Sequence, residues 1–155
     1  MVTNKNNYKK LYLKYKLKYK STKKILNNKI VGGKKNKPNY TEHVSEPWFS
    51  FIKIGLKTVE GRLNKGRFEE MKVGQIVEWK NNDFSERTVL TKIIAKNKYA
   101  SFAEYLNKEK LRKCLPGFDT NKEGVDVYYK YYSKEKEEQY GIVAIHLELL
   151  KSKQN

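Results

Sequence analysis

Residues 45–62, SEPWFSFIKIGLKTVEGR, join a short apolar helix to a charged strand through a glycine. Pro47 suits the first turn of a helix, because its missing N–H would have no partner there, and Ser45 or Glu46 can cap that end. Gly55 suits the left-handed position that ends a helix. Apolar side chains recur at helical spacing at Trp48, Phe49, Ile52 and Leu56. The segment therefore predicts a helix that buries one face and stops near the glycine.

After the glycine the apolar period changes from helical to alternating. Residues 58–62 predict a strand, in which Val59 points away from the polar side chains. Lys57 lies in the turn, so alternation does not determine its direction. The polar side chains that share one face of the strand are Thr58, Glu60 and Arg62. With Lys57, the segment brings three ionisable groups to the start of a sheet.

Two roles fit Lys57, Glu60 and Arg62. As a binding site, they offer a contact for a phosphate or carbonyl, an acceptor for the amino group of a base, and a planar fork for a carboxylate or phosphate. As a structural element, the same residues form an ion pair that pins the helix to the strand. Residue types alone leave both roles open.

Trp48 and Trp79 are candidates for stacking on a nucleobase, which contributes ~1 to 3 kcal/mol per base. A core position is the alternative for Trp48, since it lies on the apolar face of the helix. Trp79 lies at the end of a predicted strand, beside Lys80 and Asn81. The candidate ligand-binding residues are Lys57, Glu60, Arg62, Trp48, Trp79 and Thr58.

The sequence predicts neither a metal site nor a cofactor. Cys114 is the only cysteine, which excludes an intrachain disulfide and a two-cysteine metal site. His43 and His146 are the only histidines, and no cysteine pair is present to complete a zinc site with them. A phosphate-binding glycine loop is not expected, because Gly32 and Gly33 lack the flanking strand and helix.

The excess of positive charge is concentrated at one end of the sequence. The chain has 34 basic and 17 acidic residues, and residues 1–38 hold thirteen of the lysines and no acidic residue. Taking those thirteen away leaves 21 basic side chains against 17 acidic ones. We therefore expect a basic Lys/Tyr-rich extension and linker over residues 1–39 and one domain over residues 40–150. No apolar stretch approaches the ~20 residues that cross a bilayer, so we expect an intracellular protein without a transmembrane segment.

Residues 8–20, YKKLYLKYKLKYK, fit both a helical and a period-two apolar stripe. We favour a helix that forms on contact with a partner, since the lysines would repel one another along a free strand edge. An acidic partner or an anionic membrane surface would suit it, so an interaction protein acting through this extension is one functional class to consider. The lysine-rich and asparagine-rich composition is typical of AT-rich genomes such as those of large DNA viruses, for which the location would be a host cytoplasm, nucleus or virion.

The remaining sequence predicts strands over residues 73–80 and 87–95, a helical region, and a last strand over residues 141–150 that closes the sheet. Capping boxes starting at Ser101 and Thr120 predict two of the helices, the second reaching Tyr132. Inward positions of the last strand are Val143, Ile145, Leu147 and Leu149, and outward positions are Ala144, His146 and Glu148. Too few helices separate the strands for regular parallel crossovers, so the predicted class is α+β.

The helix–glycine–strand segment resembles the signature of the ASCH domain, the activating signal cointegrator homology region. That signature is a proline-aromatic helix followed by G-x-K-x-x-E-x-R, which stands here as Gly55, Lys57, Glu60 and Arg62. The resemblance extends over roughly residues 40–150. It implies the PUA-like fold, a small mixed β-barrel with covering helices, and a ligand cleft beside the signature. It also implies nucleic acid, and RNA in preference to DNA, as the partner. The resemblance does not cover the basic extension, which we expect from its charge to add affinity for phosphates.

One branch of the same superfamily resembles this sequence at the same segment and deacetylates N4-acetylcytidine. Its lysine matches Lys57, but its threonine nucleophile falls where Glu60 stands, and Thr58 comes two positions too early. If the chain is such an amidohydrolase on a modified nucleoside, Glu60 would orient a water as general base and Lys57 would polarise the carbonyl. Binding, hydrolysis and an interaction through the extension are the three functions that the sequence leaves open.

Overall fold

The computed structural model describes Leu13 and residues 37–150. The segment 8–20, apart from Leu13, and most of the expected extension over residues 1–39 lie outside the described residues. The described strands are β1 (Tyr40–Val44), β2 (Val59–Leu63), β3 (Ile76–Asn81), β4 (Thr88–Tyr99) and β5 (Ile142–Leu149). The described helices are α2 (Trp48–Lys53), α3 (Gly66–Glu70), α4 (Phe102–Glu109), α5 (Leu111–Cys114), α6 (Asn121–Tyr128) and α7 (Lys134–Tyr140).

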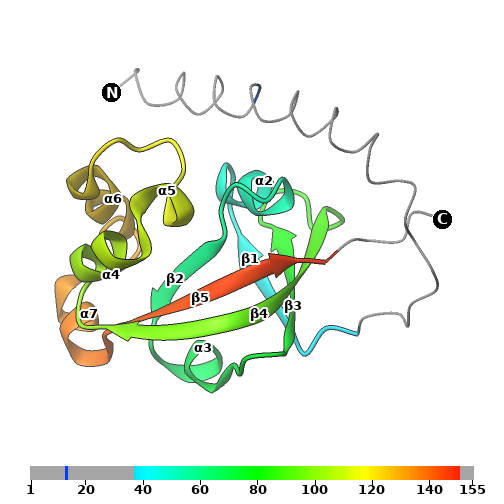
Figure 1. Cartoon of the computed structure of the whole chain (residues 1–155), viewed down its shortest axis with the longest axis horizontal. Coiled ribbons are helices and arrows are strands. Elements are labelled where there is room, and N and C mark those ends of the chain that lie inside the picture. The colour runs from blue at the N-terminus through cyan, green and yellow to red at the C-terminus, as the bar shows by residue number, and fades with distance from the viewer. Residues whose placement is uncertain (1–12, 14–36, 151–155) are drawn as a thin grey trace.

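The strands form one curled sheet in the order β1-β3-β4-β5-β2 (Figure 1). Strands β1 and β3 are parallel, and the other pairs are antiparallel. The α+β class is therefore confirmed. The sheet is a half-barrel rather than the expected closed barrel, because the edge strands β1 and β2 are not hydrogen-bonded to each other within the described sheet. The prediction that the last strand closes the sheet is wrong, since β5 lies between β4 and β2.

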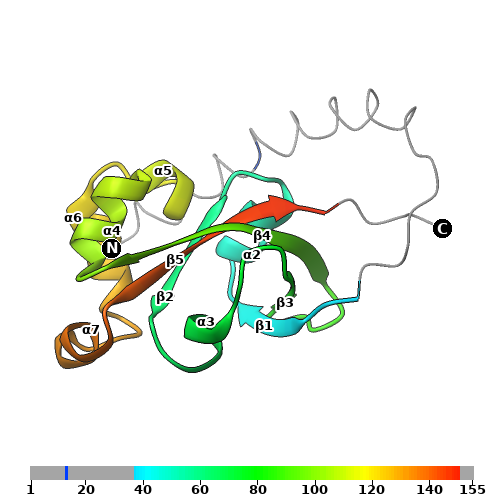
Figure 2. The ribbon, with the colours of Figure 1, turned by 60° about the horizontal axis from the view of Figure 1, so that its bottom comes forward.

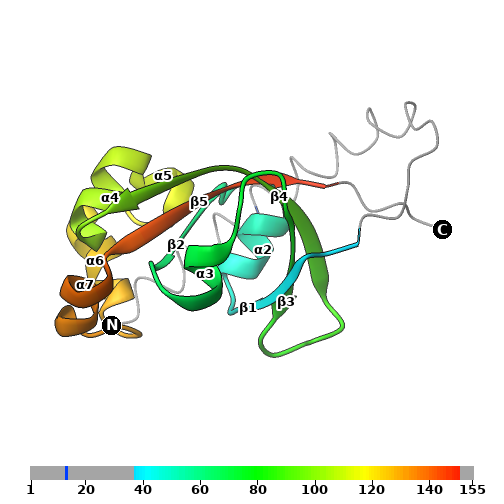
Figure 3. The same ribbon diagram turned by 90° about the horizontal axis from the view of Figure 1, so that it is seen from below.

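The two faces of the sheet bury two hydrophobic clusters. Helix α2 lies inside the curl of the sheet (Figure 3), and the cluster there consists of Val44, Phe49, Ile52, Met71, Val77, Trp79, Val89, Ile93, Val143, Ile145 and Leu147. Helices α4 to α7 gather at one end of the sheet (Figure 2). The second cluster consists of Val59, Leu63, Phe102, Tyr105, Leu106, Leu111, Cys114, Leu115, Phe118, Val127, Tyr128, Ile142 and Ala144.

Strand β5 is covered on both faces along most of its length, unlike the alternating strand that was predicted. Ala144, expected to face outward, has no exposed surface because the helical end of the molecule covers it. His146 was also expected to point outward, but its Nε2 lies 3.0 Å from Glu109 Oε1 at the end of α4. The sequence pattern did not predict these contacts, because the alternation of a strand does not show which of its polar positions a helix covers.

Helix α2 follows the predicted pattern closely. Pro47 is the N-cap residue and not the first helical one, and the preceding Glu46 accepts a hydrogen bond from the backbone N–H of Ser50 at 3.2 Å. Gly55 takes a φ of +72° just after the helix, the left-handed conformation that glycine adopts without a Cβ clash. Leu56 was predicted to lie on the apolar face of this helix, but it lies beyond the turn and is only half-buried. The observed apolar face is therefore one residue shorter than the predicted one.

Both predicted capping boxes mark helix starts. The Ser101 side chain accepts from the N–H of Glu104, and Thr120 and Glu123 form a reciprocal box at the start of α6. Helix α6 ends at Tyr128 instead of reaching Tyr132. The elements that the sequence pattern did not predict, β1, α3 and α7, are short and mostly polar. Among the described residues, no helix has the length and hydropathy needed to cross a membrane.

Candidate functional site

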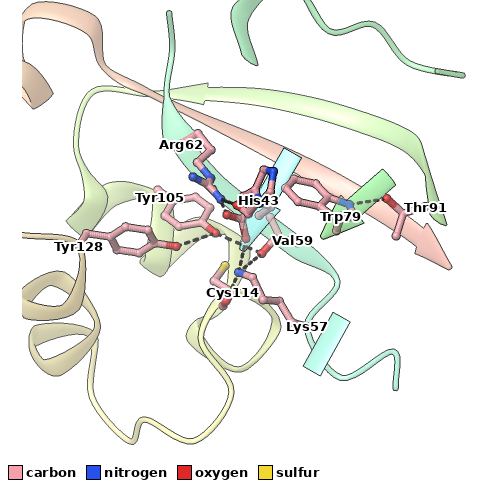
Figure 4. A network of polar contacts seen from close by, with 10 residues as sticks. His43, Lys57, Val59, Arg62, Trp79, Thr91, Tyr105, Cys114 and Tyr128 are labelled. Atoms are coloured by element: carbon pink, nitrogen blue, oxygen red, sulfur yellow. Dashed lines mark hydrogen bonds and ion pairs between the residues drawn. The ribbon is translucent and has the colours of Figure 1, made fainter. Parts of the chain in front are cut away.

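Lys57 lies at the centre of the site with its ammonium group buried. Its side chain is 2% exposed and forms an ion pair with Glu60 at 2.9 Å. The same Nζ donates to the backbone carbonyl of Val59 at 2.8 Å and to the backbone carbonyl of Cys114 (Figure 4). An ammonium group has three N–H donors, and here each has an acceptor. Lys57 thus ties the turn after α2 to both β2 and α5.

Glu60 is held between two cations. One carboxylate oxygen faces Lys57, and the other accepts from Arg62 Nε at 2.7 Å. Burial by itself raises the pKa of Glu60, but the charges of Lys57 and Arg62 and their hydrogen bonds outweigh it and hold the pKa below its usual value. The carboxylate is therefore ionised at neutral pH.

Arg62 bridges the open seam of the half-barrel. From β2, its Nη2 donates to the backbone carbonyl of His43 on β1 at 3.1 Å. The guanidinium also lies over the ring of Phe68, 5.0 Å from its centroid. Burial lowers the pKa of Arg62, yet the charge of Glu60 and contact with Tyr132 outweigh it and raise the pKa above its usual value. The sequence signature therefore spans the gap between the two sheet edges.

A pocket opens where these three residues meet the helices. Its volume is about 150 Å³, and its lining residues are His43, Val44, Ser45, Trp48, Lys57, Glu60, Gly61, Arg62, Asn82, Leu115, Val127, Tyr128, Tyr131 and Tyr132. A cavity of about 150 Å³ holds one benzene-sized ring, whereas sites for drug-sized ligands occupy roughly 300–1,000 Å³. The pocket therefore suits a single flat ring.

Four of the fourteen residues that line the pocket are tryptophan or tyrosine. Trp48 is half-buried and stacks on Phe118, with ring centroids 6.0 Å apart and planes at 29°. Tyr131 is 63% exposed at the rim. Tyr128 lies deeper, and its hydroxyl donates to that of Tyr105 at 3.4 Å. Such walls can hold a planar group by stacking, because every base has a π-face.

The structure brings together four of the six candidate ligand-binding residues, namely Lys57, Glu60, Arg62 and Trp48, in the pocket lining. Trp79 is elsewhere: it has no exposed surface, and its indole N–H donates to Thr91 Oγ1 at 2.8 Å. A fully buried ring has no face for a base, so the structure contradicts a stacking role for Trp79. Thr58 does not line the pocket, although its backbone N–H donates to the carbonyl of Lys113 at 3.0 Å.

Several lining residues were not in the predicted set. His43 lies on β1, a strand that the sequence pattern did not predict. Tyr128, Tyr131 and Tyr132 come from the end of α6 and the segment after it. A run of four tyrosines within residues 128–132 was the available signal, since so many cannot all be buried. Nothing in the local pattern indicated that this run faces the signature.

The geometry gives little support to the hydrolytic roles considered for Lys57 and Glu60. Every N–H of Lys57 is already used, so none is directed at a substrate carbonyl. Glu60 is a weak base because its pKa is lowered. Burial raises the pKa of the nearby Cys114 thiol to about 11, so the thiol stays protonated at neutral pH. Within residues 37–150, no group of three or more potential ligands from His, Cys, Asp or Glu is placed to hold a metal ion.

Two solved structures have folds similar to that of this chain. The hypothetical protein PH0355 has a similar crystal structure, with 33% identity and a TM-score of 0.66, covering 72% of this chain and 98% of that one. The solution structure of protein PF0455 from Pyrococcus furiosus has 33% identity and a TM-score of 0.59, covering 73% of this chain and 98% of that one. A search of curated proteins finds no match.

Neither neighbour is described with a ligand, and neither supports the viral origin that the composition suggested. The half-barrel with its helices is consistent with the PUA-like fold. The ASCH domain family matches residues 43–151, which include the signature, the pocket and every strand except the start of β1. The chain therefore belongs to the ASCH domain family.

Proposed function

We propose that the chain binds single-stranded RNA by taking one unpaired base into the pocket at the signature. The observation that carries the proposal is a ring-sized pocket whose lining includes Trp48, three tyrosines and an ionised Glu60. ASCH domains generally bind nucleic acid. Sequence-specific RNA recognition typically targets unpaired bases, which stack on aromatic side chains and form hydrogen bonds along one edge.

Each member of the signature has a distinct part in this proposal. The oxygens of Glu60 have further lone pairs that can accept from the amino or imino N–H of a base. Arg62 has guanidinium N–H groups beyond those that contact Glu60 and His43, and these can donate to a base carbonyl or a phosphate. Lys57 positions Glu60 and does not contact the base. A modified nucleoside that keeps the same edge would bind in the same way.

The first prediction tests the aromatic wall at its most exposed member. Replacing Tyr131 with alanine removes a stacking surface worth ~1 to 3 kcal/mol, so the affinity for short single-stranded RNA should fall on the order of tenfold. The side chain is 63% exposed, so folding should be preserved. Fluorescence anisotropy of labelled octamers of A, C and U, with the full chain, measures the change.

Phe84→Ala is the matched control for Tyr131→Ala. Phe84 is also an exposed aromatic residue, at 53%, but it does not line the pocket. We expect this variant to bind as the unaltered chain does. Equal losses in both variants, or none in either, would rule out the pocket as the site of base binding.

The second prediction concerns the basic residues 1–38, which we propose add phosphate affinity without base choice. Thirteen lysines lie in this range. Neutralising them to glutamine in the full chain should flatten the dependence of log K on log salt, by about 0.7 for each phosphate of a single strand that the lysines no longer neutralise. Relative affinities for A, C and U octamers should not change, because phosphate contacts carry no base information. An unaltered salt slope would show that this segment is not the electrostatic anchor.

A further inference from the structure

Three exposed cations follow α4 in quick succession. Lys110, Arg112 and Lys113 are exposed, while Leu111 between them is buried. Residues 110–118 contain no acidic side chain. None of the three cations takes part in an ion pair with any other described residue. We call Lys110, Arg112 and Lys113 the α5 ridge.

The α5 ridge adjoins the pocket. The carbonyl of Lys113 accepts from the backbone N–H of Thr58 at 3.0 Å, which joins the ridge to the signature segment. Leu115, two residues further on, lines the pocket. Two residues span at most ~7 Å. The Cα of Lys113 therefore lies within about 7 Å of the Cα of Leu115 in the pocket wall, a distance comparable to the length of one nucleotide.

Lys110 occupies a backbone conformation that does not favour a lysine. Its φ is +69° and its ψ is 117°, and it is the one described residue other than glycine with a positive φ. A Cβ is unfavourable in this region, where glycine is the usual residue. Folding by itself therefore gives no reason for a long cationic side chain here, and strained positions of this kind are often found at functional sites.

We propose that the α5 ridge binds the sugar-phosphate backbone of the RNA strand whose base enters the pocket. This inference rests on the proposed function and adds the path that the strand follows, from the pocket across α5. An RNA backbone fits better than an acidic peptide because the ridge adjoins a pocket that suits one flat ring. Unpaired exposed cations contribute to such binding by releasing the counterions of the phosphates.

The test compares two full-chain variants with equal loss of charge. One combines Lys110→Gln, Arg112→Gln and Lys113→Gln, and the control combines Lys72→Gln, Lys92→Gln and Lys98→Gln, which are exposed positions outside the pocket. Anisotropy titrations use labelled octamers of A, C and U between 50 and 200 mM salt. Each phosphate that is no longer neutralised should reduce the salt slope by about 0.7, which corresponds to a loss on the order of fivefold at 0.1 M salt.

We expect the ridge variant to lose about 2 from the slope, at about 0.7 for each of three phosphates, with the order of preference among the octamers unchanged. The control variant should lose much less. Equal losses of salt slope in the two variants, or an unchanged slope in the ridge variant, would overturn the proposal that the α5 ridge binds the RNA backbone. If Tyr131→Ala still weakens binding in that case, the pocket proposal stands alone. An unaltered chain that binds none of the octamers would overturn both.

Lys110→Gly separates a structural role from a binding role at the strained position. We expect this variant to unfold at the same or a higher urea concentration, because glycine removes the unfavourable Cβ, and to lose about 0.7 from the salt slope. A variant that is less stable but binds the octamers with an unchanged slope would show that the lysine serves the fold, and the ridge assignment would be wrong. Tighter binding of an acidic peptide such as poly-glutamate than of the octamers, abolished in the ridge variant, would also overturn it.

Discussion

Replacing Lys57 with methionine is expected to lower the free energy of unfolding by about 3–5 kcal/mol, because it removes one partner of a buried ion pair. The ammonium is 2% exposed and donates to Glu60 and to the carbonyls of Val59 and Cys114. Its loss leaves a carboxylate with only Arg62 as a partner and two carbonyls without a donor. Small domains are stable by only about 5–15 kcal/mol, so this change removes a large part of the free energy of unfolding.

Urea unfolding of the full chain measures the effect, and Lys80→Met is its matched control. Lys80 is half-buried, and its Nζ lies 3.9 Å from Glu78 Oε2. For such a loose pair, the expected change in the free energy of unfolding is below about 1 kcal/mol. Adding Glu60→Gln to Lys57→Met should cost less than the sum of the single changes, since the two side chains interact directly. A loss below about 1 kcal/mol for Lys57→Met would show that the ammonium does not hold β2 and α5 together.

The same ion pair has a pH signature. The pKa of Glu60 is lower in the folded chain than its ordinary value of 4.5. A depressed carboxyl pKa contributes stability above the unfolded value, and this contribution is lost as the pH falls from about 4.5 through the folded pKa. The fall in stability below this pH should therefore be shallower in the variant with both Lys57→Met and Glu60→Gln than in the unaltered chain.

Gly61→Ala is expected to have the second largest effect, a loss of stability of about 3 kcal/mol from overpacking. A Cβ on Gly61 would lie 2.6 Å from two ring carbons of Tyr105 and 2.9 Å from its hydroxyl oxygen. Tyr105 cannot move aside easily because it is fully buried and packs edge-on against Tyr128, with centroids 5.9 Å apart. Since Gly61 and Tyr128 both line the pocket, the proposed binding of RNA should weaken as well.

Gly124→Ala is the control for Gly61→Ala. Its Cβ would also meet close atoms, at 2.7 Å and 2.8 Å, but these are the terminal methyl carbons of Leu106 and Leu111. Flexible side-chain ends can shift, and alanine is favoured over glycine in a helix by about 1 kcal/mol, so the net loss should be below about 1.5 kcal/mol. In a double-mutant cycle, Tyr105→Leu should be less costly with alanine at 61 than with glycine. Equal losses for the two glycine variants would mean that Tyr105 does not require the glycine.

Local chemistry made much of the fold predictable. The contact of Glu46 with the first turn of α2, the left-handed Gly55, the cap at Ser101 and the capping box at Thr120 each depend on residues within a few positions of one another. The sequence alone therefore indicated where those helices begin or end. Alternation likewise placed Glu60 and Arg62 on one face of a strand. The strand β1 escaped prediction because its residues are mostly polar and its pairing with β3 joins distant parts of the chain.

By itself, the sequence determined the class of the fold, its family and the identity of the charged residues at the centre of the site. Only the tertiary structure decided what those residues contact. Each N–H of the Lys57 ammonium has an acceptor, and Arg62 donates across the seam to the carbonyl of His43 on β1. The tyrosines at the end of α6 and after it line the same pocket. The tertiary structure also places Trp79 in the core, where no base can reach it. The reason is physical, since capping and alternation act between neighbours in the chain, whereas burial and pocket shape depend on which distant segments the fold packs together.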